Sequence, residues 1–94
     1  RSGTRIAGRD NLMGSPIRLP EIGAGNSSLS VSCWLVNTGD FLDQGDRVVE
    51  LVTAGSTFDV SAPVTGRLSR IDKPLDTAVA VGDILGWIEP EPGP

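Results

Sequence analysis

The 94-residue sequence contains no histidine and no tyrosine, and only one cysteine and one lysine. Without histidine, the chain lacks the commonest general base and the commonest metal ligand of proteins. Cys33 alone can form neither an internal disulfide nor a thiolate metal cluster, and no histidine is present to activate it as a nucleophile. We therefore predict that the chain is not an enzyme, that it has no catalytic residue and no metal site, and that Cys33 is a small core residue.

The chain is also poor in positive charge, with a formal net charge of −4. Binding of nucleic acid requires clustered Lys and Arg to neutralise phosphates, so we expect no nucleic-acid partner. No apolar run approaches the roughly 18 residues of a membrane span, and the first residues include no apolar segment of signal-peptide type. We expect no direct membrane insertion and a cytoplasmic location, which a single unpaired cysteine permits.

The length suits one small domain with a modest core. Residues 1–15 are rich in Gly, Arg and Ser and show no periodicity. Residues 90–94 read Pro-Glu-Pro-Gly-Pro, which is the composition of an extended linker. We therefore expect a flexible N-terminal tail over 1–15, one domain over 16–89 and a C-terminal linker over 90–94.

Within the domain, β-branched and apolar residues alternate with polar ones over short distances, which predicts strands. We place them at 17–19, 30–36, 47–52, 56–60, 64–71, 78–81 and 84–88, and no segment shows a sustained helical period. The stretch from Glu50 to Val60 predicts a β-hairpin whose exposed turn is centred on Ala54-Gly55, because glycine tolerates the positive φ of tight turns.

Three carboxylates, Asp40, Asp43 and Asp46, recur at a spacing of three. A calcium loop requires oxygen ligands at alternate positions and a distal glutamate, so this spacing does not match one. We predict a solvated double turn with Phe41 and Leu42 tucked beneath it. The two tryptophans, 34 and 87, are expected to pack into the small core.

The chain carries a weak internal repeat. The segment Asp40-x4-Gly45-Asp46 and the strand after it resemble Asp76-x5-Gly82-Asp83 and the strand after that, with one extra residue in the second copy. Two such halves suggest a β-sandwich with pseudo-two-fold symmetry.

Several short motifs, taken in order, resemble those of the biotinyl/lipoyl carrier domain family. They are Leu19-Pro20-Glu21-Ile22-Gly23, Trp34-Leu35-Val36-x-x-Gly39-Asp40, the segment from Gly45 to Thr53, Ala62-Pro63-Val64-Thr65-Gly66, Asp76-Thr77 and Val81-Gly82-Asp83-Ile84-Leu85. The resemblance covers about residues 17–89. It implies an all-β fold, a flattened β-barrel or sandwich of two four-stranded antiparallel sheets, with the hairpin tip at the end opposite the termini.

In that family, the hairpin tip carries the lysine to which lipoate or biotin is attached. The resemblance aligns the tip with Thr53-Ala54-Gly55-Ser56, so Gly55 occupies the attachment-lysine position, flanked by Ala54 and Ser56. Glycine offers no amine, and Lys73 falls in a different turn. We therefore expect no covalently bound cofactor and no cofactor-binding residue.

The resemblance favours an unmodified lipoyl-like domain that serves as a structural or protein-interaction module of a larger protein or multienzyme complex. As the resemblance implies, such domains occur in membrane-fusion components of transporters and as non-carrier domains of multienzyme assemblies. In the transporter components a long inserted hairpin usually separates the two halves, whereas residues 53–56 join the arms directly here. The alternative is an acyl or carboxyl carrier domain of a 2-oxo acid dehydrogenase or biotin-dependent carboxylase, with a lost or altered attachment site. Lipoate or biotin would be a cofactor only under this alternative.

Overall fold

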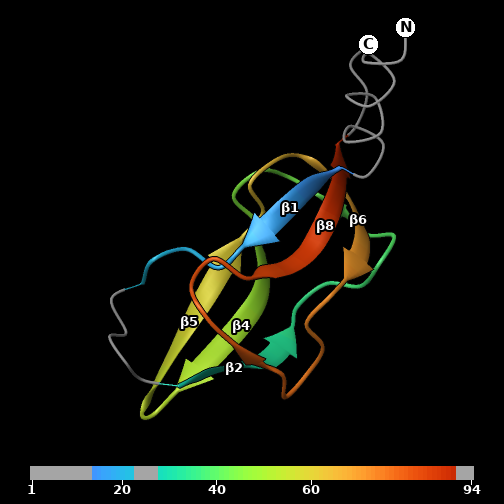
Figure 1. The fold of residues 1–94 in the computed structure, drawn as a ribbon. Coiled ribbons are helices and arrows are strands. Elements are labelled where there is room, and N and C mark those ends of the chain that lie inside the picture. Colours follow the sequence, from blue (N-terminus) through green and yellow to red (C-terminus); the bar gives the residue numbers. More distant parts are fainter. Residues whose placement is uncertain (1–13, 23–27, 91–94) are drawn as a thin grey trace, which may run out of the picture.

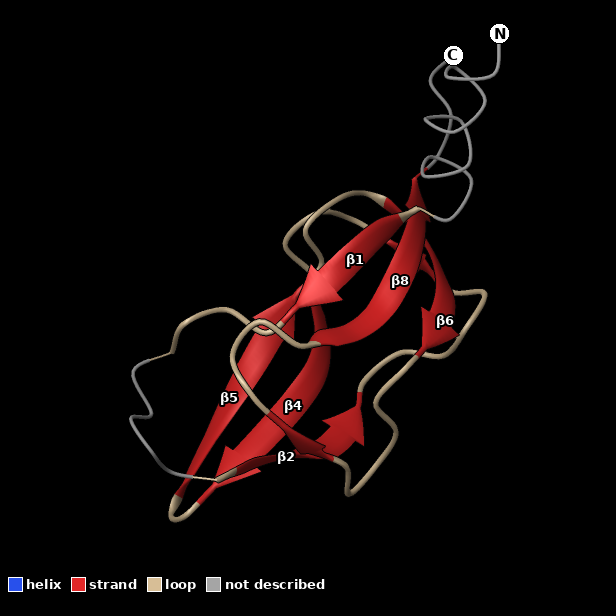
Figure 2. Cartoon of the chain, in the orientation of Figure 1, coloured by secondary structure: helices blue, strands red, loops and turns tan. Residues whose placement is uncertain are grey.

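A computed structural model of the chain describes residues 14–22 and 28–90 (Figure 1). The expected tail and linker lie almost entirely outside these residues. Of their members only Gly14, Ser15 and Pro90 are described, and Ser15 and Pro90 belong to strands, so the domain extends slightly beyond the predicted 16–89. The described chain forms eight strands and no helix (Figure 2). The strands are β1 (Ser15–Arg18), β2 (Leu29–Trp34), β3 (Phe41–Leu42), β4 (Arg47–Thr53), β5 (Ser56–Ser61), β6 (Gly66–Ile71), β7 (Ala78–Val79) and β8 (Ile84–Pro90).

The strands make two four-stranded antiparallel sheets, which confirms the predicted fold class. One sheet has the order β1-β8-β6-β3 and the other the order β5-β4-β2-β7. All the pairings between neighbouring strands are antiparallel. None of the described residues belongs to a helix that could cross a membrane.

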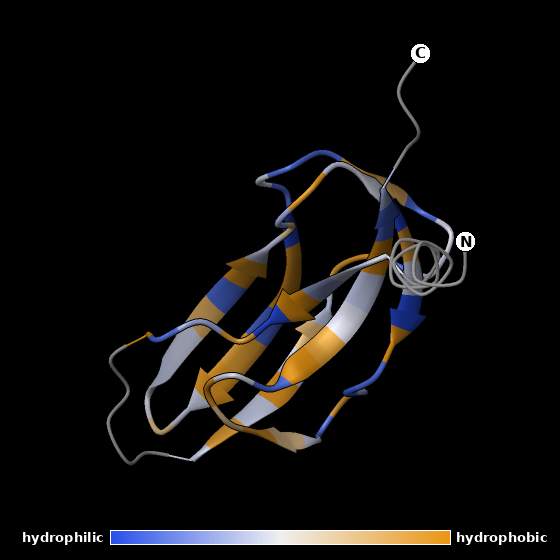
Figure 3. Cartoon of the chain, turned by 45° about the horizontal axis from the view of Figure 1, so that its top comes forward, coloured by the Kyte–Doolittle hydropathy of each residue, from blue (hydrophilic) through white to orange (hydrophobic). Residues whose placement is uncertain are grey.

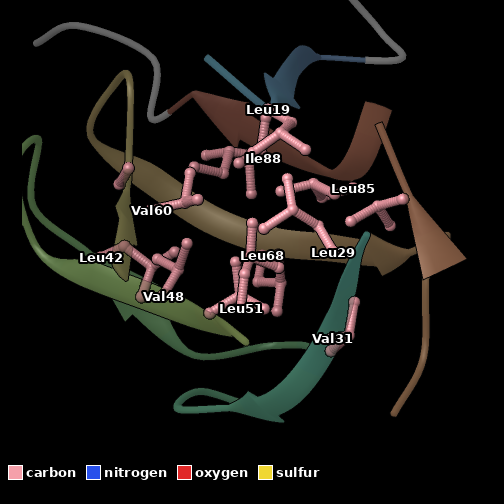
Figure 4. Close-up of a cluster of buried hydrophobic side chains, with 14 residues drawn as sticks. Leu19, Leu29, Val31, Leu42, Val48, Leu51, Val60, Leu68, Leu85 and Ile88 are labelled. Atoms are coloured by element: carbon pink, nitrogen blue, oxygen red, sulfur yellow. The ribbon is translucent and has the colours of Figure 1, made fainter. Parts of the chain in front are cut away.

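The space between the sheets is filled by apolar side chains from both of them (Figure 4). Among the described residues, no polar or charged residue is buried. Hydrophobic and hydrophilic residues follow one another along the strands (Figure 3), as expected for sheets with one buried and one solvated face. Burying each Val, Leu or Ile contributes about 1.5–3 kcal/mol, so this core dominates the stability of the domain. Its members are Ile17, Leu19, Leu29, Val31, Leu42, Val48, Val49, Leu51, Val60, Ala62, Leu68, Val79, Leu85 and Ile88.

The two halves of the chain repeat the same structure at a constant offset of 37 residues. Strands β2, β3 and β4 correspond in their bounds to β6, β7 and β8. The loop hydrogen bonds repeat as well: the Gly39 N–H donates to the Leu68 carbonyl, and the Asp76 N–H donates to the Val31 carbonyl. The sequence alignment that matched Asp40 with Asp76 was therefore wrong by one residue. Asp40 corresponds to Thr77, and the second copy contains no extra residue.

One type of turn occurs four times, at residues 37–40, 43–46, 74–77 and 80–83. In each turn, the fourth residue donates its N–H to the carbonyl of the first. The third residue has a positive φ, and it is glycine in three turns and Asp76 in the other. In the three glycine turns, the fourth residue is an aspartate whose Oδ2 accepts the first residue's N–H at 2.8–2.9 Å. The exception begins with Pro74, which has no N–H to donate, and it ends with Thr77 instead of aspartate.

The predicted burial of Cys33 and of Phe41 was wrong. Cys33 is exposed, because a bulge between Val31 and Cys33 shifts the alternation of β2 and turns the thiol away from the core. Of the pair predicted to tuck beneath the double turn, only Leu42 does so. Phe41, on the edge strand β3, is 47% exposed, because neighbouring residues of a strand point to opposite faces.

Candidate functional site

The tip of the hairpin between β4 and β5 is the site that the sequence singles out. Thr53 pairs with Ser56, which leaves Ala54 and Gly55 as a two-residue loop. Gly55 has a φ of +78°, whereas Ala54 has no positive φ. The predicted exposed turn is confirmed, since Ala54, Gly55 and Ser56 are all exposed. Figure 1 shows this tip at the opposite end of the domain from the start of β1 and the end of β8.

Space at the tip is open, but the tip offers no amine. A Cβ added to Gly55 would meet no atom within 4 Å. Thr53 and Ser56 carry hydroxyl groups, Ala54 carries a methyl group and Gly55 carries only a hydrogen. Lipoate or biotin joined through an amide to a lysine therefore does not fit the residues present in this turn.

Thr53, the last residue of β4, directs its hydroxyl inward. Its Oγ1 is buried and has no hydrogen-bond partner among the residues that the structure describes. In the same described part of the chain, no group of three or more His, Cys, Asp or Glu residues is arranged to hold a metal ion.

Lys73, the one lysine of the chain, is half-buried in the loop between β6 and β7. Its carbonyl accepts a hydrogen bond of 2.7 Å from the Trp34 indole N–H, and its own N–H donates to the Leu85 carbonyl. Trp34 pairs with Val49 near the start of β4, whereas the hairpin tip follows the end of β4. The structure thus holds the backbone of Lys73 away from the tip.

Trp34 packs against the core as predicted, whereas Trp87 does not. Trp87 is half-buried, and its indole N–H donates to Asp72 Oδ2 at 3.0 Å. Arg70 donates to Asp72 Oδ1 at 2.7 Å, and its guanidinium lies 5.7 Å from the Trp87 ring centre. The Arg70 hydrogen bond is the main cause that lowers the pKa of Asp72. Partial desolvation of the carboxylate raises this pKa, and the hydrogen bond from Trp87 lowers it. The sequence offered no signal for this cluster, because its members come from different strands and a loop.

A surface groove of about 560 Å³ lies beside β3 and the start of β4. Its lining includes the apolar residues Leu35, Phe41 and Leu42 and the charged residues Asp40, Asp46 and Arg47. Leu35 and Phe41 are 43% and 47% exposed. This groove was not predictable from the sequence, because Phe41 was expected to lie beneath the turn.

Comparison with known proteins identifies relatives of this chain. A family model described as "biotin-requiring enzyme" matches residues 15–88. The chain is 32% identical over 72 residues to a dihydrolipoyllysine-residue succinyltransferase component of the 2-oxoglutarate dehydrogenase complex from Bacillus subtilis. This match covers 77% of this chain and 17% of that protein. The chain is also 29% identical over 77 residues to a dihydrolipoyllysine-residue acetyltransferase component of the pyruvate dehydrogenase complex from Staphylococcus aureus. This match covers 82% of this chain and 18% of that protein.

A solved structure shares the fold. The lipoyl domain of the 2-oxoglutarate dehydrogenase complex from Azotobacter vinelandii matches with a TM-score of 0.62 at 21% identity, over 80% of this chain and 95% of that domain. The chain spans less than a fifth of the length of the two curated relatives. Because the family model spans most of the chain, from β1 into β8, the chain belongs to the biotinyl/lipoyl domain family.

Proposed function

We propose that this domain is an unmodified member of its family and acts as a structural or protein-interaction module within a multidomain or multienzyme assembly in the cytoplasm. In this proposal, Gly55 stands where the carrier members hold their modified lysine. The domain then contributes its fold and its surface to an assembly and carries no acyl or carboxyl group.

The observation that carries the proposal is the chemistry of the hairpin tip. Position 55 lies in the two-residue loop, and the side chains around it supply no nucleophilic amine. Lipoate and biotin are joined to carrier domains through an amide, so a tip without an amine has no group to acylate. The half-buried Lys73, whose backbone is fixed by hydrogen bonds to Trp34 and Leu85, offers no lysine on an exposed hairpin.

The test is the intact mass of the protein after co-expression with lipoate ligase and, separately, with biotin ligase. We expect the unmodified mass in both cases. A lipoyl domain that keeps its lysine, expressed in the same cells, is the positive control and should gain the mass of one cofactor. An adduct on this chain, mapped by peptide sequencing to Lys73, would refute the proposal.

The relatives favour a second candidate. The matched proteins are acyltransferase components of 2-oxo acid dehydrogenase complexes, which is consistent with a carrier domain whose attachment site has been lost or altered. To carry a group itself, such a domain would need an adduct at Lys73, the one lysine of the chain, so the same mass measurement separates a working carrier from the first candidate. In both cases, the partners belong to a protein assembly.

A further inference from the structure

We propose that the groove beside β3 is a docking site for a basic, partly apolar segment of a partner protein. In the bound state, Leu35 and Phe41 would contact an apolar side chain of that segment, and Asp40 and Asp46 would contact a neighbouring Lys or Arg. This inference deepens the interaction role proposed above, and it does not depend on the modification state of the hairpin tip.

The internal repeat shows that the fold does not require large apolar residues at this place. At the offset of 37 residues, Leu35 corresponds to Asp72 and Phe41 corresponds to Ala78. The backbone is the same in both copies: the Leu35 N–H donates to the Val48 carbonyl, and the Asp72 N–H donates to the Leu85 carbonyl. Since a charged residue and a methyl group serve the second copy, the exposed Leu35 and Phe41 side chains of the first are explained by contact with another molecule.

Phe41 is held in a defined position although it is exposed. The Arg67 guanidinium lies 5.7 Å from the centre of its ring and also donates to the Gly39 carbonyl at 3.2 Å. A side chain that is fixed before binding loses little conformational freedom on binding, so an exposed aromatic residue of this kind is a good anchor for a partner.

The charge of the groove indicates a basic partner. The Asp40 carboxylate accepts the Asn37 N–H at 2.8 Å, and the Asp46 carboxylate accepts the Asp43 N–H at 2.9 Å, which fixes both groups in place. Neither forms an ion pair with another described residue. Two positive groups lie beside the groove, and both are already engaged. The Arg47 guanidinium is paired with Asp59 at 3.1 Å, and the Arg67 guanidinium lies over the Phe41 ring and donates to the Gly39 carbonyl. Together with the net charge of −4, this arrangement attracts a cationic segment.

The groove is well separated from the hairpin tip. Arg47 begins β4 and Thr53 ends it, so the groove and the tip lie about 20 Å apart along the strand. A partner seated in the groove therefore leaves the tip accessible, and the two sites can be tested independently.

The experiment selects peptides from a phage-displayed random library against the full 94-residue chain, then measures binding of the most enriched synthetic peptide. We expect enriched peptides to place an apolar residue next to Lys or Arg. Titration of that peptide into isotope-labelled protein should shift the backbone amide signals of residues 35–47 and leave residues 53–56 unchanged. Affinity should fall as salt is added, because exposed ion pairs are screened.

Matched variants test the two halves of the proposal. Leu35→Ala with Phe41→Ala should weaken the peptide about tenfold, as expected for loss of an anchor. Phe41→Ala introduces the residue type found at the equivalent position 78, so the fold is expected to persist. Asp40→Asn with Asp46→Asn keeps the acceptor for each turn N–H and removes the charge; it should weaken the peptide about threefold and flatten the salt dependence.

Leu75→Ala is the control, because Leu75 is 60% exposed but lies in another turn; its affinity should equal that of the wild type. The proposal is overturned if no peptide is enriched, if the amide shifts lie outside the groove, or if the groove variants bind as the wild type does. A cofactor adduct in the mass measurement would contradict the unmodified state and leave this docking site untouched.

Discussion

Gly55 combines open space with a backbone that disfavours other residues. Its φ of +78° lies in the left-handed region, and a Cβ there would touch nothing within 4 Å. We predict that Gly55→Lys lowers the free energy of unfolding by about 1 kcal/mol, through backbone strain alone. Gly55→Ala, which introduces the same Cβ without the long side chain, should cost the same amount by chemical denaturation.

A much larger loss for the lysine variant than for the alanine variant would mean that the tip packs against another part of the chain. If the two costs agree, the lysine variant is a suitable substrate for lipoate and biotin ligases. Failure of both ligases on that folded variant would show that they require more of the turn than a lysine.

Asp72 makes stability depend on pH at the acid side. Its pKa is lowered below the ordinary value of 3.8, mainly by the hydrogen bond from Arg70, so the folded state favours the ionised carboxylate. This contribution is fully present above 3.8 and is lost as the pH falls through the lower pKa of the folded state.

We predict that Asp72→Asn reduces this acid-side loss of stability. The measurement is denaturant unfolding of wild type and variant from neutral to acid pH, followed by circular dichroism. Parallel curves for the two proteins, with a constant offset at every pH, would contradict the prediction.

At the scale of single elements, the four related turns provide their own control. In the turn 80–83, the Asp83 carboxylate accepts the Ala80 N–H at 2.8 Å. In the turn 74–77, the last residue is Thr77 and the first is Pro74, which has no N–H for a side chain to accept. We predict that Asp83→Ala lowers the free energy of unfolding by about 1 kcal/mol, the typical net value of one hydrogen bond. Thr77→Ala should change it by much less, and equal effects in thermal unfolding of the two variants would refute this assignment.

The contact between β6 and β8 depends on glycine at position 86. A Cβ there would lie 2.6 Å from the Arg70 carbonyl oxygen and 3.1 Å from the Trp34 ring. We predict that Gly86→Ala lowers the free energy of unfolding by about 1–3 kcal/mol, because the strands must separate.

Gly82→Ala is the comparison for this steric effect, because Gly82 has a φ of +92° and open space around it. It should cost only the backbone strain, about 1 kcal/mol. If Gly86→Ala proves no more costly than Gly82→Ala, then β6 and β8 can adjust without loss, and the close approach is not needed.

Seven of the eight strands were predictable from sequence, but the short strand β3 and several side-chain directions were not. The alternation around Ala54-Gly55 fixes the hairpin, since hydrophobic period and turn chemistry agree there. A bulge has no comparable signal, and the one in β2 reversed the expected direction of Cys33. The two-residue strand β3 is too short for a periodic pattern, so its outward-facing Phe41 could not be distinguished from its inward-facing Leu42.

At the scale of the whole molecule, the two halves are interleaved. Each sheet contains two strands from β1–β4 and two from β5–β8. We predict that fragments 1–54 and 55–94, made separately, are each unfolded by circular dichroism and by the narrow spread of their amide signals, because neither fragment can complete a sheet or the core. A well-dispersed spectrum from either fragment alone would contradict this.

The architecture was predictable because many short motifs agree in order and spacing across most of the chain, although each is weak alone. The groove was not predictable, because it depends on which side of a short edge strand faces water. The repeat was detected but misaligned by one residue, because Asp76 itself takes the positive φ that glycine takes in the other turns. An aspartate in a glycine's place can be recognised only from the backbone.

Strands β1 and β8 are antiparallel neighbours, and Ser15 lies opposite Ile88. The chain therefore enters and leaves the domain at points about 5 Å apart. In any longer protein, the domain would form a side branch and add almost nothing to the distance between its flanking segments. Both attachments lie at one end, so they would act together as a single pivot, and the hairpin tip would sweep the widest arc around it.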